Sequence, residues 1–209
     1  MTSLRERNRT RTRRDIENAA LELFEKQGYD ATGVDEITEL AGVSRATFFR
    51  YYGSKEEVLF TNETDAVAEM VAHIAEREDP RQNLAALASP VARFGRGLLD
   101  DDSSEGQRLT RLVMTTRELE ARSMRMRLRW ERGIARQLAR ERDEQSPATT
   151  DILLANLAVA CLAAALWAWQ ASPEDTTIER ILGDQFADAL RLCGLGFCLL
   201  IAQTVRCDC

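Results

Sequence analysis

The chain has 209 residues, of which 44% are hydrophobic and 30% are charged, as is usual for a soluble globular protein. This length allows either one large core or a small domain followed by a larger one. The formal net charge of −6 excludes a protein that holds nucleic acid over a broad basic surface. Four prolines, eleven glycines and the lack of alternating strand patterns predict an all-α protein.

The charge is distributed unevenly along the chain. Residues 1–14 contain six arginines and one glutamate, whereas residues 15–60 contain four basic and ten acidic residues. Any contact with a polyanion must therefore be focused on a few positions.

Helix signals follow one another through the first sixty residues. An amphipathic stripe predicts a helix over residues 11–27, which ends at Gly28 in a left-handed cap. Thr32 is expected to cap a short second helix that ends at Gly42, and Ser44 to cap a third helix over residues 45–51. The second and third helices form a helix-turn-helix pattern. A Ser54-x-x-Glu57 capping box then predicts one long helix to about residue 76.

The sequence after residue 80 predicts five more helices, at residues 81–99, 106–116, 118–142, 149–171 and 177–198. Linkers are expected at residues 100–104, 145–147 and 172–173. We expect two domains, residues 1–58 and 59–209. The apolar run Ile152–Trp169 is interpreted as a buried packing helix rather than a membrane span, because it contains Asn156 and lacks positive flanks. A cytoplasmic protein without membrane contact is therefore expected.

Four stretches in the first sixty residues resemble the TetR family of regulators. They are residues 16–24 (IENAALELF), 28–32 (GYDAT), 34–44 (VDEITELAGVS) and 46–59 (ATFFRYYGSKEEVL). The resemblance implies a three-helix DNA-binding domain, a helical ligand-binding and dimerisation domain behind it, and a homodimer. It further implies a repressor that releases double-stranded operator DNA when a small-molecule inducer binds.

The first turn of the third helix is the expected base-reading element, because recognition helices enter the major groove by their N-terminal residues. Arg45 and Arg50 are the candidates for guanine contacts, with contact to a phosphate as the alternative. The resemblance assigns phosphate contacts to Thr32, Thr47, Tyr51 and Lys55. The complete set of expected DNA-binding residues is Thr32, Ser44, Arg45, Ala46, Thr47, Phe49, Arg50, Tyr51 and Lys55.

Two features qualify this assignment. Phe49 departs from the tyrosine that many family members use on the DNA backbone, so one phosphate contact is expected to be lost. The arginine-rich segment from Arg5 to Arg14 is either an arm that reaches the minor groove or a disordered tail that attracts DNA without sequence specificity.

Residues 109–142 resemble the ligand domain of mycofactocin-type TetR regulators, which implies a fatty acyl thioester as a ligand class. Phe94, Met114, Trp130 and Trp167 are the candidate pocket residues, with plain core packing as the alternative. One helical face in this stretch carries arginines, which either form a cationic rim for a phosphorylated ligand or a solvated face paired with Glu118 and Asp102. These arginines are Arg122, Arg125, Arg129, Arg132, Arg136 and Arg140.

The last two long helices are expected to be apolar around most of their circumference. Small residues there favour a dimer interface, or seam, of four helices, two from each protomer; they include Ala158, Ala163, Ala164 and Ala165. An enzyme is not expected, because the single histidine, His73, has no nucleophile motif near it. No cofactor or metal site is expected either. A transcriptional activator of the same fold and an architectural DNA-binding protein are the remaining alternatives.

Overall fold

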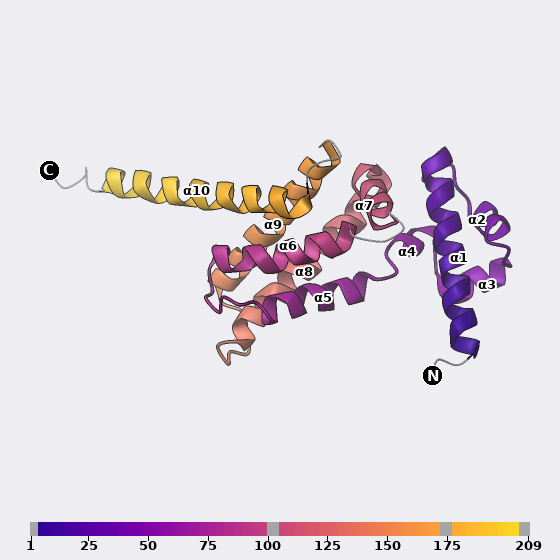
Figure 1. The fold of residues 1–209 in the computed structure, drawn as a ribbon, viewed down its shortest axis with the longest axis horizontal. Helices are drawn as coiled ribbons and strands as arrows, with labels where there is room; N and C mark the ends of the chain where they lie inside the picture. The colour runs from indigo at the N-terminus through magenta and orange to yellow at the C-terminus, as the bar shows by residue number, and fades with distance from the viewer. Residues whose placement is uncertain (1–3, 100–104, 172–176, 205–209) are drawn as a thin grey trace. The chain divides into compact units, whose positions relative to one another are not determined.

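The structure, a computed structural model, describes residues 4–99, 105–171 and 177–204. Regular secondary structure in these residues is entirely helical, which confirms the predicted fold class. The predicted linkers at residues 100–104 and 172–173 lie outside the described residues. The helices are α1 (Leu4–Gln27), α2 (Val34–Leu40), α3 (Arg45–Tyr51), α4 (Lys55–Leu59), α5 (Glu63–Ala75), α6 (Leu84–Leu99), α7 (Glu105–Thr115), η1 (Arg117–Leu119), α8 (Glu120–Arg140), α9 (Thr149–Ala171) and α10 (Ile178–Thr204) (Figure 1).

The described chain forms two compact units. The first contains residues 4–64 and 105–125, and the second contains residues 65–99 and 126–204. A stretch from the second half of the sequence, with α7, η1 and the first turns of α8, thus belongs to the same unit as α1–α4.

The first unit is built on α1, against which α2, α4 and α7 pack. Its core contains Ile16, Phe24, Ile37 and Phe48, each at most 2% exposed. Gly28 has a φ of +89°, so the predicted left-handed cap after α1 is confirmed. The start of α1 differs from the prediction, because the helix begins at Leu4 and includes the arginine-rich segment. From residue 4 onward that segment is therefore helical and not a disordered tail.

Two predictions about the helices in this part of the chain are wrong, one about an N-cap and one about the continuity of a helix. The N-cap of α2 is Gly33 rather than Thr32, because the Glu36 carboxylate accepts the Gly33 N–H at 2.8 Å. The Thr32 hydroxyl turns back and donates to the Gly28 carbonyl at 2.8 Å. The single long helix predicted from Ser54 is interrupted between α4 and α5, where Phe60 is buried at 6% exposure. The caps at Ser44 and Ser54 are confirmed, since each hydroxyl accepts a backbone N–H three residues later.

In the second unit α6, α9 and α10 pack on one another (Figure 1). Gly95 of α6 allows the close approach: a Cβ atom there would lie 2.8 Å from Leu182 Cδ1 and 3.2 Å from Leu162 Cδ1. Ala158 and Ala165 of α9 are also buried inside this unit, so these two predicted seam residues pack within the protomer. Exposed apolar side chains nevertheless remain on α9 and α10, namely Ile152, Leu153, Trp167, Leu190 and Leu192.

Helix α9 is long and apolar enough to cross a membrane, with a mean hydropathy of 2.1 over its most apolar window, 39% of which is buried. The core helix of a soluble protein meets the same criteria. Eight of its residues are buried, among them Ala155, Val159 and Leu162.

A buried carboxylate fixes the turn between α8 and α9. Asp151 is 1% exposed, and its two oxygens accept from Arg142 Nη1 and Nη2 at 2.7 and 2.6 Å. The Ala148 N–H also donates to this carboxylate at 2.8 Å. The Arg142 hydrogen bond is the main cause that lowers the pKa of Asp151 below its usual value.

We predict that Asp151→Asn lowers the free energy of unfolding at pH 7 by about 2 kcal/mol, because the substitution removes a charge-assisted bidentate contact. Since the pKa of Asp151 is depressed in the folded protein, its stabilisation is complete above the unfolded pKa of about 3.9 and is lost as the pH falls through the folded pKa. Urea unfolding between pH 7 and pH 3 should therefore show a difference between the two proteins that shrinks in acid. Glu144→Gln, at the half-exposed second partner of Arg142, is the control and should cost less than about 1 kcal/mol. Equal losses in both variants would contradict the role given to Asp151.

Candidate nucleic-acid interface and pocket

Helix α3 is anchored at its start and along one side. Ser44 Oγ accepts the Thr47 N–H at 3.1 Å and lies 3.0 Å from the Thr47 hydroxyl. Phe48 is fully buried and Tyr52 is 4% exposed, so this side packs into the core. The opposite face is open to solvent and presents four of the predicted DNA-binding residues, Arg45, Ala46, Phe49 and Arg50.

The arginines on this face have neighbours that limit their freedom. Arg45 Nη1 forms an ion pair with Asp35 Oδ1, and the Arg45 guanidinium lies 5.8 Å from the centre of the Phe49 ring. The Arg50 guanidinium lies 5.3 Å from the centre of the half-buried Tyr51 ring. Arg9 of α1 lies 6.0 Å from the same ring. The first turns of α1 therefore bring cationic side chains next to α3.

Lys55 and Thr32 have a different setting from the other predicted phosphate donors. Lys55 Nζ donates to the carbonyls of Tyr29 and Thr32 at 2.6 and 2.8 Å, and it lies 4.3 Å from the centre of the Tyr29 ring. Thr32 is 1% exposed. In the protein without DNA both side chains thus close the loop between α1 and α2, whereas Thr47 and Tyr51 remain partly exposed.

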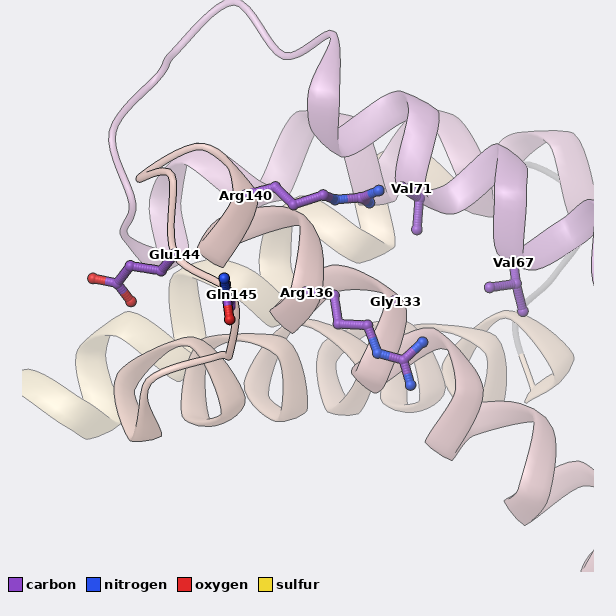
Figure 2. A pocket seen from close by; sticks show the side chains of 7 residues that line it. All are labelled: Val67, Val71, Gly133, Arg136, Arg140, Glu144 and Gln145. Atoms are coloured by element: carbon purple, nitrogen blue, oxygen red, sulfur yellow. The ribbon is translucent and has the colours of Figure 1, made fainter.

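A pocket of about 300 Å³ lies between α5 and α8 in the second unit. The side chains of Val67 and Val71 line it from α5, opposite Gly133 of α8. A Cβ atom at Gly133 would lie 3.0 Å from Val71 Cγ2, so this glycine allows α8 to approach α5 closely at the pocket. Arg136, Arg140, Glu144 and Gln145 complete the lining, and Figure 2 shows Arg140 extending toward the helix that carries Val71.

The four predicted pocket residues do not gather at this site. Phe94 and Trp130 are buried and stack edge to face with ring centres 5.2 Å apart, which is a core contact within the second unit. Met114 lies on α7 in the first unit, and Trp167 is 54% exposed on α9. None of the four contributes to the lining of the pocket between α5 and α8.

The arginine face of α8 is divided between two environments. In the first unit Arg122 Nη2 lies 2.9 Å from Glu63 Oε2, and both Arg122 and Arg125 approach Glu56. In the second unit Arg136 and Arg140 lie at the pocket, and within the described residues neither forms an ion pair. Arg122 and Arg125 are therefore paired, with Glu56 and Glu63 as partners, whereas Arg136 and Arg140 form no ion pair within the described residues.

Sequence reasoning missed Asp35, Val67, Val71 and Gly133. Asp35 and Arg45 are ten residues apart, and only the turn between α2 and α3 brings them together. Gly133 did carry a signal, because an isolated glycine within a run of good helix formers costs about 1 kcal/mol and usually has a packing reason.

We predict that Lys55→Met destabilises the free protein by about 1–3 kcal/mol, because it leaves two carbonyls of the α1–α2 loop without their donor. Thermal unfolding in the absence of DNA measures this loss. Lys26→Met, at the exposed end of α1, is the control for removal of a lysine charge and should leave stability nearly unchanged. If Lys55→Met lowered only DNA affinity, Lys55 would instead be the phosphate contact that the family resemblance implies.

Comparison with known proteins agrees with this arrangement. Residues 16–61 match the family described as bacterial regulatory proteins of the tetR family, and residues 81–192 match the MftR C-terminal domain. The chain is 29% identical over 182 residues to a Mycobacterium tuberculosis protein described as the mycofactocin biosynthesis transcriptional regulator MftR, covering 86% of this chain and 90% of that one. It is 36% identical over 141 residues to the HTH-type transcriptional regulator TcmR of Streptomyces glaucescens, covering 65% of this chain and 62% of that one.

Solved structures share the fold. NalD, the secondary repressor of a multidrug efflux pump in Pseudomonas aeruginosa, superimposes with a TM-score of 0.63 at 18% identity, over 86% of this chain and 96% of that one. The SmeT–triclosan complex, whose protein is the repressor of a Stenotrophomonas maltophilia efflux pump, gives a TM-score of 0.64 at 20% identity, over 87% and 90% of the two chains. With a tetR-type helix-turn-helix domain followed by an MftR-type C-terminal domain, this chain belongs to the TetR family of transcriptional regulators.

Proposed function

We propose that the chain is a cytoplasmic transcriptional repressor that binds operator DNA as a homodimer and releases it when an amphipathic ligand occupies the pocket between α5 and α8. In this proposal residues 1–58 bind DNA, and residues 59–209 bind the ligand and form the dimer. The observation that carries the proposal is the exposed face of α3, where Arg45 and Arg50 project from a helix capped by Ser44.

Major-groove geometry supports the role of α3. An α-helix fits the major groove, and an arginine near its N-terminus can donate two hydrogen bonds to guanine O6 and N7. Thr47 and Tyr51 lie at the edges of the same helix with hydroxyl groups for phosphate oxygens. Arg9 of α1 adds a cationic side chain beside Tyr51. Because a helix is 10–12 Å wide and the minor groove about 6 Å, the helical segment that carries Arg9 suits the phosphate backbone rather than the groove floor.

The dimer in this proposal uses the apolar residues that α9 and α10 expose. Leu153, Trp167 and Leu192 are 57%, 54% and 72% exposed, and apolar surface of this kind on long helices favours association. A two-fold dimer would place two copies of α3 about 34–36 Å apart, or a multiple of this, as successive major grooves require.

The pocket supports a ligand with an apolar part and an anionic part. Val67, Val71 and Gly133 offer apolar contact, and Arg136 and Arg140 offer two cations without an ion pair in the described chain. A fatty acyl thioester of coenzyme A combines both chemistries, with phosphates for the arginines and an acyl chain for the valines. Release of DNA requires that this ligand bind the DNA-free conformation more tightly than the DNA-bound one.

We predict that the wild-type protein binds DNA from upstream of its own gene tightly and resists unrelated competitor, and that Arg45→Ala weakens this binding by about 1–3 kcal/mol. Fluorescence anisotropy at near-physiological salt is the measurement. Arg132→Ala, which removes an exposed arginine from α8, is the matched control and should bind as the wild type does. Binding no better than to unrelated DNA would contradict a sequence-specific repressor at this promoter.

We predict that palmitoyl-coenzyme A releases the labelled DNA from the wild-type protein but not from Gly133→Val, whose side chain would crowd Val67 and Val71 and change the lining of the pocket. The double variant Arg136→Ala/Arg140→Ala should need at least about a hundredfold more ligand, since each of the two charge-assisted contacts contributes about 1.5–3 kcal/mol and about 1.4 kcal/mol is a factor of ten. Coenzyme A alone and palmitate alone separate the two halves of the ligand. If Gly133→Val responded to palmitoyl-coenzyme A like the wild type, the site between α5 and α8 would not be the effector site.

A further inference from the structure

We propose that Asp35 determines base specificity by holding Arg45 in the orientation that reads one base pair, with the Phe49 ring as the second support. This inference rests on the proposed function, because it concerns how α3 reads DNA. Asp35 acts through Arg45 and is therefore a positioning residue.

The carboxylate and the ring approach the Arg45 guanidinium from two directions. Asp35 forms its ion pair through Nη1, and Phe49, one helical turn after Arg45, lies 5.8 Å away at the ring centre. The Phe49 ring is itself placed by an edge-to-face contact with the fully buried Phe48, with ring centres 5.3 Å apart. Arginine has five N–H donors, so the Asp35 contact leaves donors for a two-bond contact with guanine.

The backbone that carries the ion pair is fixed by local hydrogen bonds. The Thr38 hydroxyl donates to the Asp35 carbonyl at 2.9 Å, which holds the first turn of α2. Gly42, with a φ of +65°, and the Val43 N–H, which donates to the Thr38 carbonyl at 3.0 Å, set the turn to α3. Arg45 is the first residue of α3, directly after this turn. The separation of Asp35 and Arg45 is therefore a property of the helix-turn-helix itself.

Asp35 has no other evident task within the described residues. Capping of α2 is performed by the next residue, Glu36, whose carboxylate accepts from Gly33 N and from Gln27 Nε2. The side chain of Asp35 is 71% exposed, so it contributes little to the core. Its negative charge beside the DNA face repels phosphates and lowers affinity for every sequence. A residue that weakens all binding but orients the reading arginine trades affinity for specificity.

The test begins with selection of a binding sequence from random double-stranded DNA by the wild-type protein. Dissociation constants are then measured for the selected site, for its single-base variants and for unrelated DNA, with wild type, Arg45→Ala, Asp35→Asn and Glu39→Gln. Glu39 is an exposed acid on the same helix α2. The control substitution Glu39→Gln therefore removes one negative charge from α2 and leaves the ion pair between Asp35 and Arg45 in place.

Asp35→Asn should reduce discrimination about tenfold at the base pair whose discrimination Arg45→Ala also abolishes, and leave the other positions unchanged. Its affinity for unrelated DNA should stay equal or rise, as in Glu39→Gln, which should keep full discrimination. The inference is overturned if Asp35→Asn retains full discrimination at that base pair, or if it weakens binding to all DNA equally together with a lower melting temperature. If the wild type selected no sequence at all, the proposed function itself would fail, and this outcome is distinct from either of the other two.

Discussion

The ion pair between Arg122 and Glu63 is the contact on which the first unit depends. Glu63 opens α5 with a side chain that is 5% exposed, and Arg122 Nη2 approaches it to 2.9 Å. The same guanidinium covers the buried Phe60 ring at 5.1 Å, so α4 ends where this ring turns inward. Loss of Arg122 would leave the carboxylate of Glu63, whose side chain is 5% exposed, without this partner, and an unpaired buried charge is strongly destabilising. The pair therefore ties the first turns of α8 to the junction of α4 and α5.

The acidic composition and the DNA-binding role are compatible because the acids and the bases are used in different places. Glu25 pairs with Arg108, Glu56 and Glu63 approach Arg122, and Glu36 caps a helix. These carboxylates are neutralised inside the first unit or engaged by its backbone. Arg50 and Arg9, whose guanidinium groups lie against the Tyr51 ring, can act on a polyanion over the short range that physiological salt allows. Net charge is a poor guide here, because the local field at α3 decides binding.

Local signals made much of the fold predictable, whereas contacts between distant residues decided the rest. The caps at Gly28, Ser44 and Ser54 depend on neighbours within four residues, and the sequence predicts them correctly. The break at Phe60 depends on Arg122, sixty-two positions away, so no local pattern reports it. Two of the predicted pocket residues, Phe94 and Trp130, pack against each other in the core, because a large apolar residue at helical spacing fits a core and a pocket equally well. The pocket between α5 and α8 lies instead beside Gly133, where the lack of a side chain lets the two helices approach closely.

The arginine stripe of α8 shows how one periodic pattern can serve two purposes. Arg122 and Arg136 are both arginines of α8, but Arg122 is paired with Glu63 in the first unit, whereas Arg136 lies at the pocket in the second unit. Helix α5 has the same division, since Glu63 starts it and Val67 and Val71 line the pocket further along. The two helices that form the pocket are thus the two that begin at the buried ion pair.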